Sequence, residues 1–176
     1  MLIRPATDDD VHDLGAVLVD AVGSGACVGF LADVTLDEAE AFWVAALVGG
    51  TTWVARLGAD EPVVGVVQLL PAKLPNGSHR AEVAKLLVHR SGRRRGVAKE
   101  LMRTAEQEAS AQGRWLLQLD TETGSAAERL YIRLGWQVLG VLPDHAVRPE
   151  GGLVPTTFLY KRLRPQEAPG TRHVER

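Results

Sequence analysis

The sequence from His79 to Ala109 reads HRAEVAKLLVHRSGRRRGVAKELMRTAEQEA. Its first part, Ala81 to His89, is apolar and predicts a strand, which Ser91 and Gly92 end. Strict alternation would place Glu82, Ala84, Leu86 and Val88 on one face and Val83, Lys85 and Leu87 on the other. After Gly96, apolar residues recur at helical spacing: Val97, Ala98, Leu101, Met102, Ala105 and Ala109. The segment therefore predicts a strand, a turn and a helix with one buried face.

The turn between this strand and helix carries the most suggestive chemistry. It consists of Arg93, Arg94, Arg95 and Gly96, and Val97 and Ala98 open the helix. The unpaired N–H groups and positive dipole end of a helix N-terminus favour anions, and a glycine lets a phosphate approach the backbone. Neither a Walker loop nor a dinucleotide-binding glycine pattern is present. Taken alone, the turn fits an anion site and a solvated arginine turn equally well.

The rest of the chain alternates between further strand and helix patterns. Strands are expected at Leu2–Pro5, Thr51–Leu57, Pro62–Leu70, Trp115–Leu119, Trp136–Leu142 and Thr156–Leu163. Helices are expected after Asp8–Asp10, after Thr35 or Asp37, and after Gly124. In the second of these, the expected buried residues are Ala41, Phe42, Ala45, Leu47 and Val48. Pro143–Pro155 is expected to be an irregular loop.

This order predicts an α/β or α+β domain of three layers with a mixed sheet, although the strand order cannot be derived from it. We expect one domain, residues 1–163, and a disordered tail, residues 164–176.

Composition narrows the partners and the compartment. The formal net charge of −2 gives no overall attraction to nucleic acid or to an anionic membrane, and we expect neither partner. The single cysteine, Cys27, cannot form an internal disulfide, which fits a reducing compartment. The N-terminal residues do not have the pattern of a signal peptide, and no apolar run is long enough to span a bilayer. We therefore expect a cytoplasmic protein.

Two motifs together resemble those of the GCN5-related N-acetyltransferase (GNAT) family. They are Arg93-x-x-Gly96-x-Ala98 after an apolar strand, and Ala127-x-x-Leu130-Tyr131-x-x-x-Gly135-Trp136. The resemblance extends over most of the chain and implies a central mixed, mostly antiparallel sheet flanked by helices. The segments around Glu82, Asp120–Glu128 and Leu142–Lys161 look most like the tabtoxin-resistance acetyltransferases.

The resemblance implies acetyl-CoA as co-substrate and assigns residues to it. Leu86, Leu87 and Val88 would pair with the pantetheine arm where their strand splays from its neighbour, and Arg93 to Ala98 would hold the pyrophosphate. Many relatives have asparagine at the position of Gly124, and the hydroxyl of Ser125 could partly replace it.

Three residues are candidates for the chemistry of acetyl transfer. The resemblance places Tyr131 near the sulfur, where a phenol can protonate the departing thiolate; otherwise Tyr131 would simply pack against the sheet. Glu82 and Asp120 are the alternatives for the base that removes the amine proton, and we place Asp120 ahead of Glu82. Their structural alternatives are an ion pair of Glu82 with Arg80 or Lys85 and a turn capped by Asp120.

Other residues support weaker hypotheses. Phe30 and Trp43 are candidates for the walls of the acceptor site, with core packing as the alternative, which we favour for Trp43. His79 and His145 are isolated, no His, Cys and carboxylate cluster has metal-ligand spacing, and Gly-x-Ser-x-Gly is missing. We therefore expect no metal.

These features predict an acetyl-CoA-dependent N-acetyltransferase acting on a small amine, such as an amino-acid-like antimetabolite or antibiotic. The alternatives are a protein lysine or N-terminal acetyltransferase and a non-catalytic acyl-CoA-binding module. A homodimer could form through the strand at Thr156–Leu163.

Overall fold

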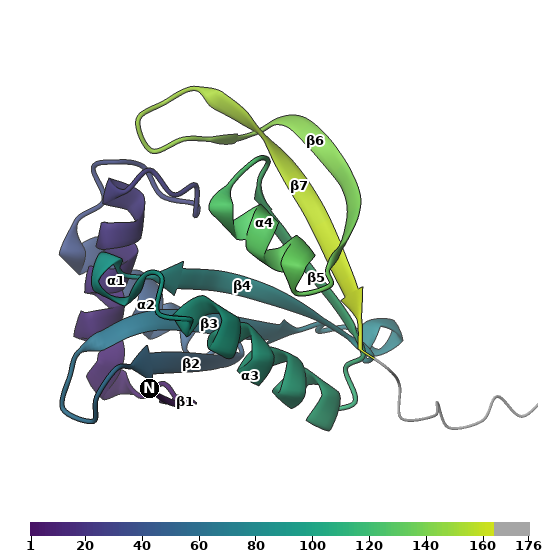
Figure 1. Cartoon of the computed structure of the whole chain (residues 1–176), viewed down its shortest axis with the longest axis horizontal. Helices are drawn as coiled ribbons and strands as arrows, with labels where there is room; N and C mark the ends of the chain where they lie inside the picture. Colours follow the sequence, from purple (N-terminus) through teal and green to yellow (C-terminus); the bar gives the residue numbers. More distant parts are fainter. Residues whose placement is uncertain (164–176) are drawn as a thin grey trace, which may run out of the picture.

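The computed structural model describes residues 1–163, and the predicted tail at 164–176 lies outside the described residues. A seven-stranded sheet in the order β1-β2-β3-β4-β5-β7-β6 forms its centre (Figure 1). The strands are β1 (Leu2–Pro5), β2 (Thr51–Arg56), β3 (Val63–Pro71), β4 (Arg80–Val88), β5 (Leu116–Glu122), β6 (Gln137–Val147) and β7 (Leu153–Arg162). The helices are α1 (Val11–Gly23), α2 (Leu36–Ala46), α3 (Val97–Ala111) and α4 (Ala126–Arg133). Three short 3-10 turns complete it: Asp8–Asp10, Pro75–Gly77 and Arg90–Gly92.

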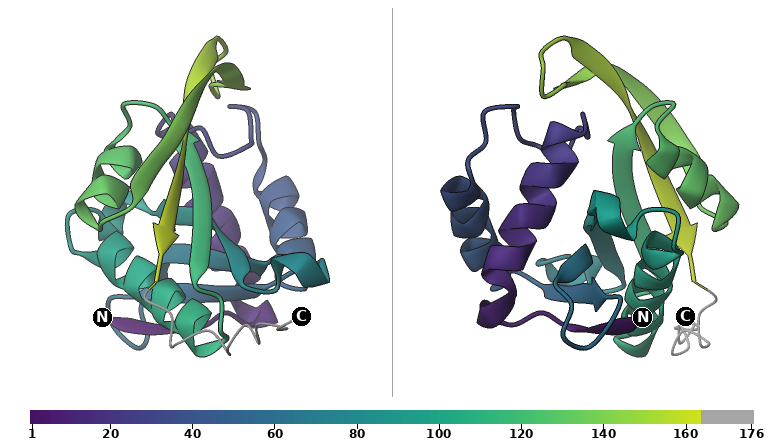
Figure 2. Two further views of the ribbon diagram at one scale, coloured as in Figure 1. Left: turned by 90° about the vertical axis from the view of Figure 1, so that its right-hand side faces the viewer. Right: turned by 60° about the vertical axis from the view of Figure 1, so that its left-hand side comes forward.

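Helices cover the sheet on both faces, which confirms the predicted three-layer fold. The right view of Figure 2 shows α1 and α2 on one side of the sheet and α3 and α4 on the other. One core joins α1 and α2 to β2, β3 and β4, through residues such as Leu14, Trp43 and Val66. The other joins α3 and the α4 tyrosine to the opposite face, through residues such as Leu101 and Leu117.

Strand pairing is antiparallel except between β4 and β5, where it is parallel. The mixed, mostly antiparallel sheet expected from the resemblance is therefore present.

Three expectations from the sequence were wrong. Much of Pro143–Pro155 is strand, because β6 continues to Val147 through a register shift after Leu142 and pairs with β7, which begins at Leu153. The strand at Thr156–Leu163 has no free edge for a dimer, since β7 lies between β5 and β6. In α2 the buried residues are Ala39 and Trp43, whereas Ala41, Ala45 and Val48 are exposed.

A buried carboxylate ties the first strand to the start of α1. Asp10 is completely buried and accepts hydrogen bonds from Arg4 (2.7 and 2.8 Å), Arg56 (3.0 Å) and the backbone N–H of Thr7 (2.9 Å). Burial alone would raise the pKa of the Asp10 carboxyl, but the bonds from Arg4, Thr7 and Arg56 hold that pKa below its usual value. Asp10 therefore joins β1, β2 and α1 as a buried anion.

Replacing Asp10 by Asn should lower the free energy of unfolding by about 3 kcal/mol, because two arginines lose their buried counter-ion. The depressed pKa of Asp10 adds stability above the carboxyl's unfolded pKa of about 4, and this is lost as pH falls through the lower folded pKa. Urea unfolding measured over this acidic range checks both effects. Asp8→Asn, at an exposed carboxylate of the same turn, is the control and should change little. Equal stabilities of the two variants would contradict the role of Asp10.

Candidate active site

The site begins where β4 and β5 separate. Their parallel pairing is limited to Arg80–Glu82 against Leu116–Gln118 within the described chain. Beyond Glu82 the two strands diverge (Figure 1), while β4 stays paired with β3 on its other side. The backbone of the second half of β4 on the β5 side is therefore free of strand pairing, which is the splay that the resemblance implied. An extended ligand could pair there.

A bulge in β4 changes which residues face this opening. The β3–β4 register shifts between Val66 and Gln68, and Lys85 adopts a positive φ of 50°. As a result Leu86 and Val88 pack against the α3 core together with Val83, whereas Leu87 lies in the α1–α2 core. The strict alternation expected from the sequence, with Leu86 and Val88 on the face of Glu82, was therefore wrong.

The turn after β4 leads into an open helix N-terminus. Gly96 is the N-cap of α3 at φ 80°, and a Cβ added to it would meet no heavy atom within 4 Å. The first intrahelical bond in this turn is from Glu100 N–H to the carbonyl of Gly96. The N–H groups of Val97, Ala98 and Lys99 therefore precede the helical ladder, as expected for an anion site. Arg94 and Arg95 are exposed beside them.

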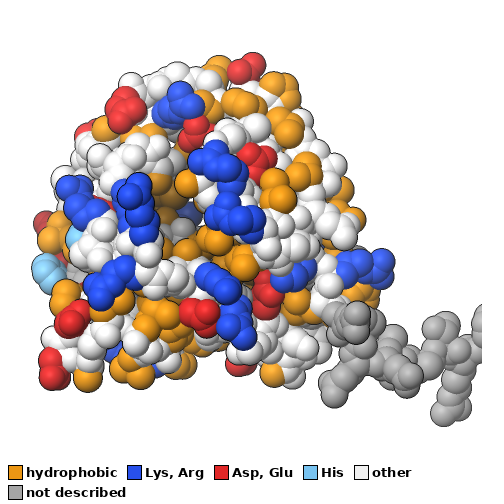
Figure 3. Space-filling view, in the orientation of Figure 1, with side chains coloured by type: hydrophobic (Ala, Val, Ile, Leu, Met, Phe, Trp, Pro, Cys, Tyr) orange, Lys and Arg blue, Asp and Glu red, His pale blue; other side chains and the backbone are white. Residues whose placement is uncertain are grey.

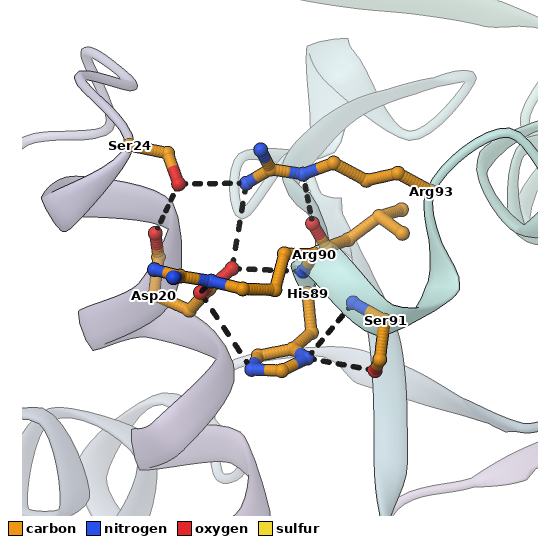
Figure 4. Close-up of polar contacts among 7 residues, drawn as sticks. Asp20, Ser24, His89, Arg90, Ser91 and Arg93 are labelled. Carbon is orange, nitrogen blue, oxygen red and sulfur yellow. Dashed lines mark hydrogen bonds and ion pairs between the residues drawn. The ribbon is translucent and has the colours of Figure 1, made fainter.

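The guanidinium of Arg93 is directed toward α1 and is not free to bind an anion. Its Nε donates to the Val88 carbonyl (3.2 Å), and its Nη2 contacts Ser24 Oγ (3.0 Å) and Asp20 Oδ2 (3.4 Å) on the α1 side (Figure 4). Of the three consecutive guanidiniums, those of Arg94 and Arg95 make no hydrogen bond or ion pair within residues 1–163. Figure 3 shows basic side chains around a hollow in this face of the molecule.

Tyr131 lies on α4 at the other side of the opening. The helix begins at Ser125, whose Oγ accepts a hydrogen bond from Glu128 N–H (3.0 Å). Tyr131 is 6% exposed and packs near Trp136, with 6.1 Å between ring centroids. Burial, and then the charge of Asp120, raise the pKa of the phenol. Its hydroxyl is thus kept protonated, and it makes no hydrogen bond to another residue of the described chain.

Ser125 is therefore used mainly as a helix cap. Its Oγ also lies 3.3 Å from Thr121 Oγ. The preceding Gly124 has φ 77° and donates its N–H to Glu128 Oε2 at 2.6 Å. These contacts orient the start of α4, and through it Tyr131.

Glu82, Lys85 and Asp120 bring charges from both strands to the opening. Burial raises the pKa of Glu82, as does the charge of Asp120, and Lys85 partly offsets this. Burial lowers the pKa of Lys85 against the opposing effect of Asp120 and Glu82. Lys85 Nζ donates to the Val28 carbonyl (3.1 Å) and lies over the Phe42 ring (5.5 Å), so it also anchors the α1–α2 loop. A carboxylate with a raised pKa beside a second carboxylate suits a proton acceptor.

A cavity of about 600 Å³ adjoins these carboxylates. It follows β5 on the face that α3 and α4 do not cover, and it has the size of small-molecule sites. Glu82 and Asp120 line one part of it, and its other walls are Trp115, Leu116, Leu117, Gln118, Leu119, Leu139, Phe158, Leu159, Tyr160 and Arg162. His79 stacks on Trp115 (4.8 Å between centroids) and His145 packs edge-on against Phe158 (5.3 Å), so both histidines have packing roles beside this cavity.

Two loops meet beyond the opening. The Ala32 N–H of the α1–α2 loop donates to the Pro149 carbonyl of the β6–β7 turn (3.1 Å), and Cys27 Sγ donates to the Val147 carbonyl (3.4 Å). Arg148 pairs with Glu122 of β5 at 2.6 Å. The α1–α2 loop and the β6–β7 turn thus form an arch across the site.

The two aromatic candidates have different positions. Trp43 is fully buried in the core, as expected, and Phe30 is partly buried with its ring edge-on to Phe42 (5.2 Å between centroids).

Residues 1–163 contain neither a group of metal ligands nor a helix suited to span a membrane. No three or more His, Cys, Asp or Glu side chains in this part of the chain are grouped so that they could hold a metal ion. Among the described helices, none has the length and apolarity that crossing a membrane requires.

Comparisons with known proteins agree with this geometry. A family model described as an acetyltransferase (GNAT) domain matches residues 38–138, which is more than half of the chain. The chain therefore belongs to the GNAT acetyltransferase family, whose enzymes use acetyl-CoA as co-substrate.

Individual relatives match this chain either over part of its length or at low sequence identity. N-acetyltransferase 8F1 of Rattus norvegicus is 39% identical over 93 residues, which make up 52% of this chain and 41% of that protein. The matched stretch is thus less than half of that relative. The ribosomal-protein-alanine N-acetyltransferase of Brucella melitensis has a TM-score of 0.78 at 25% identity, covering 93% of this chain and all of that one. A Salmonella typhimurium structure described as an acetyltransferase with its cofactor acetyl-CoA has the same TM-score at 23% identity, covering 97% and 98% of the two chains, and shows the shared fold.

Gly96 has a positive φ, which an alanine could adopt only with strain. Gly96→Ala should weaken coenzyme A binding about fivefold or more, because a Cβ strains the conformation that opens the N-terminus of α3. Isothermal titration calorimetry measures this. Gly113→Ala is the matched control, since Gly113 has φ 72° and equal space but lies after the C-terminal end of α3. Both variants should lose about 1 kcal/mol of stability, and an equal effect on binding would contradict a special role of Gly96.

Proposed function

We propose that this chain is an acetyl-CoA-dependent N-acetyltransferase that acts on the amine of a small molecule. The observation that carries the proposal is that Glu82 and Asp120 line the cavity along β5 where β4 and β5 separate, and that the charge of Asp120 also raises the pKa of Tyr131 on α4. In this proposal Leu86, Leu87 and Val88 pair with the pantetheine arm. Arg94, Arg95 and the N–H groups of the α3 N-terminus hold the pyrophosphate.

The proposed reaction needs one base and one acid. Acetyl-CoA supplies the thioester. Glu82 removes a proton from the acceptor amine, and the nitrogen lone pair then attacks the thioester carbonyl carbon. When the carbon–sulfur bond breaks, the sulfur keeps the bonding electrons and takes a proton from Tyr131. The nitrogen, now bonded to the acetyl group, gives up its second proton, which restores the phenol of Tyr131. Asp120 attracts the protonated amine to the opening.

The assignment of Glu82 as base reverses the order expected from the sequence. Glu82 is half-buried with a raised pKa, whereas Asp120 is exposed. A carboxylate with a higher pKa is the stronger base. A carboxylate that is shielded from water also keeps more of its affinity for a proton.

Two features support a small acceptor. The cavity volume of about 600 Å³ lies within the range of small-molecule sites. The arch between the α1–α2 loop and the β6–β7 turn also restricts access by the folded surface of another protein. An amino-acid-like antimetabolite or antibiotic is the acceptor class that the resemblance to the tabtoxin-resistance enzymes implies.

A second candidate is acetylation of a protein N-terminus. The Brucella melitensis structure, described as a ribosomal-protein-alanine N-acetyltransferase, favours it at 25% identity over nearly the whole chain. An extended N-terminal segment is narrow enough to pass under an arch that excludes a folded surface. Peptides must therefore be tested beside small amines.

We propose that two copies of the chain form a homodimer through β6, and not through β7 as the sequence had suggested. β6 is a terminal strand of the sheet and carries exposed Val138, Leu139, Val141 and Leu142. A free edge with apolar side chains is a template for pairing with a second copy. Analytical ultracentrifugation of the wild type and of Val141→Lys tests this, since the charged variant should be monomeric.

Acetyl-CoA consumption and thiol release should be measured first, against small amines, amino-acid analogues and peptides with free N-termini or lysines. Turnover of small amines supports the proposed function, and turnover of peptides alone supports the second candidate. Coenzyme A binding in calorimetry with no acetylated acceptor favours a non-catalytic acyl-CoA-binding module.

Tyr131→Phe should lower kcat by about 100-fold with little change in acetyl-CoA affinity, because the phenol acts only when the thiolate departs. Steady-state kinetics and calorimetry give the two values. Thr104→Val, which removes a hydroxyl bonded to the Glu100 carbonyl within α3, is the control and should keep its kcat. Unchanged turnover in Tyr131→Phe would remove Tyr131 from the mechanism.

Glu82→Gln should lower kcat/KM about 100-fold or more and remove the acidic limb of its pH profile. The sign follows from the raised pKa of Glu82: the wild-type base is protonated and inactive below that pKa and active above it. Asp120→Asn should mainly raise KM for the amine. If only Asp120→Asn abolished the acidic limb, the two roles would have to be exchanged.

A further inference from the structure

Asp20, near the C-terminal end of α1, is joined to the turn that precedes α3 (Figure 4). Its side chain is 6% exposed. Oδ2 accepts a hydrogen bond from the Arg90 N–H (2.9 Å), and Oδ1 accepts one from Arg90 Nε. Arg93 Nη2 lies 3.4 Å from Oδ2 and His89 Nε2 lies 3.6 Å from Oδ1. One carboxylate therefore contacts three residues of the same turn.

The surrounding bonds complete a framework around this turn. Ser24 Oγ donates to the Asp20 carbonyl (2.8 Å) and accepts from Arg93 Nη2 (3.0 Å). On the sheet side, the His89 N–H donates to the Val64 carbonyl at 2.9 Å. A Cβ on Gly92 would come within 3.0 Å of Val64 Cβ, so the turn is packed against β3. The turn is thus held between α1 and the sheet.

The charge of Asp20 matters for the same framework. Burial alone would raise the pKa of its carboxyl, but the Arg90 N–H and guanidinium and the nearby His89 keep that pKa below its usual value. The buried carboxylate of Asp20 thereby pairs with the guanidiniums of Arg90 and Arg93. Those of Arg94 and Arg95, which are exposed and follow Arg93 in the chain, remain for a ligand.

We propose that Asp20 is a positioning residue for the phosphates of coenzyme A. It fixes the shape of the turn and draws the side chains of Arg90 and Arg93 toward α1. The α3 N-terminus, Arg94 and Arg95 are left facing the bound anion. The proposal concerns the coenzyme site alone and does not depend on the identity of the acceptor.

Asp20→Asn keeps the size of the side chain and removes its charge. Calorimetry should show coenzyme A binding weakened about tenfold, because the turn loses its fixed shape. Asp13→Asn is the control on the same helix: Asp13 Oδ2 accepts the Val63 N–H (2.9 Å), and within residues 1–163 this side chain makes no bond to the turn itself, so the affinity should stay unchanged. Ser24→Ala, at an exposed site, releases Arg93 alone and should weaken binding about threefold.

A truncated donor separates positioning from a general structural role. In turnover assays with an accepted amine, Asp20→Asn should lower kcat/KM for acetyl-CoA about tenfold and leave that for S-acetylpantetheine, which lacks the phosphates, unchanged. An equal loss with both donors, or full coenzyme affinity in Asp20→Asn, would overturn the proposal. If no amine is acetylated, the proposed function fails, and the calorimetric result still decides the role of Asp20.

The two ends of the cavity along β5 carry opposite charges. Strand register pairs Asp120 with Phe158 and Leu116 with Arg162. Asp120 and Leu116 are four residues apart on one face, which separates the two ends by about 13 Å. Glu82 and Asp120 thus line the acidic end and Arg162 the other, with the Gln118–Tyr160 pair between them and Leu139 among the remaining walls.

Arg162 is exposed at the end of β7, stacks on Trp115 and has no counter-ion in the described chain. Its guanidinium lies 5.4 Å from the Trp115 ring centroid, and within residues 1–163 it makes no salt bridge. A guanidinium that stacks on an aromatic ring keeps its fork of N–H donors available for a carboxylate or phosphate.

We infer that the preferred acceptor carries an anionic group roughly 13 Å from its amine, the separation that the strand rise gives to the two ends of this cavity. The amine lies near Glu82 and Asp120, and the anion lies near Arg162. This inference rests on the proposed function, and it narrows the acceptor to amines that also carry an anionic group.

The test uses unbranched ω-aminoalkanoates of increasing length and their neutral terminal amides. The wild type should prefer the carboxylate at the best length by about tenfold in kcat/KM, and Arg162→Gln should abolish that preference by lowering kcat/KM for the carboxylate to the value for the amide. Arg133→Gln, at an exposed position on α4, is the matched control and should keep the preference for the carboxylate. Equal use of both series by the wild type, or a preference that survives Arg162→Gln, would overturn this inference. Failure of both series together with every other amine overturns the proposed function.

Discussion

The site depends on a change of partners along β4. At Ala81 and Glu82 this strand pairs with both β3 and β5, and beyond Glu82 it keeps only β3. The unpaired backbone that results is costly to bury and therefore calls for another partner. The bulge at Lys85 turns Leu86 and Val88 into the α3 core at the same point. Opening, free backbone and entrance to the cavity all follow from one interrupted strand pairing.

Three buried or half-buried carboxylates show how surroundings decide what an acid does. Asp10 and Asp20 lie at opposite ends of α1, and each is surrounded by arginines and backbone N–H groups that stabilise its charge. Glu82 is half-buried beside another carboxylate, with Lys85 as a weaker counterweight, and its charge is disfavoured. The first two are suited to hold structure together, and the third is suited to exchange a proton.

The sequence was informative where the signal is local. Glycines and arginines marked the turn, helical spacing marked α3, and Thr35 caps α2 as expected, with its Oγ accepting the Glu38 N–H. It failed where distant segments decide. The bulge at Lys85 depends on register with β3, and the internal position of β7 depends on strand order. The orientation of Arg93 depends on Asp20, seventy-three residues earlier, and one aspartate within an amphipathic helix gives no local sign of such a partner.

The two ligand regions are built from separate parts of the chain. The candidate phosphate turn belongs to the segment from β4 to α3, whereas the cavity walls come mostly from β5, β6 and β7. Substitutions in the last three strands can therefore reshape the cavity while the turn, its glycine and its contacts with α1 stay intact. Such a division allows descendants of one ancestral chain to acquire different acceptors by drift in the C-terminal strands, without ever losing the donor.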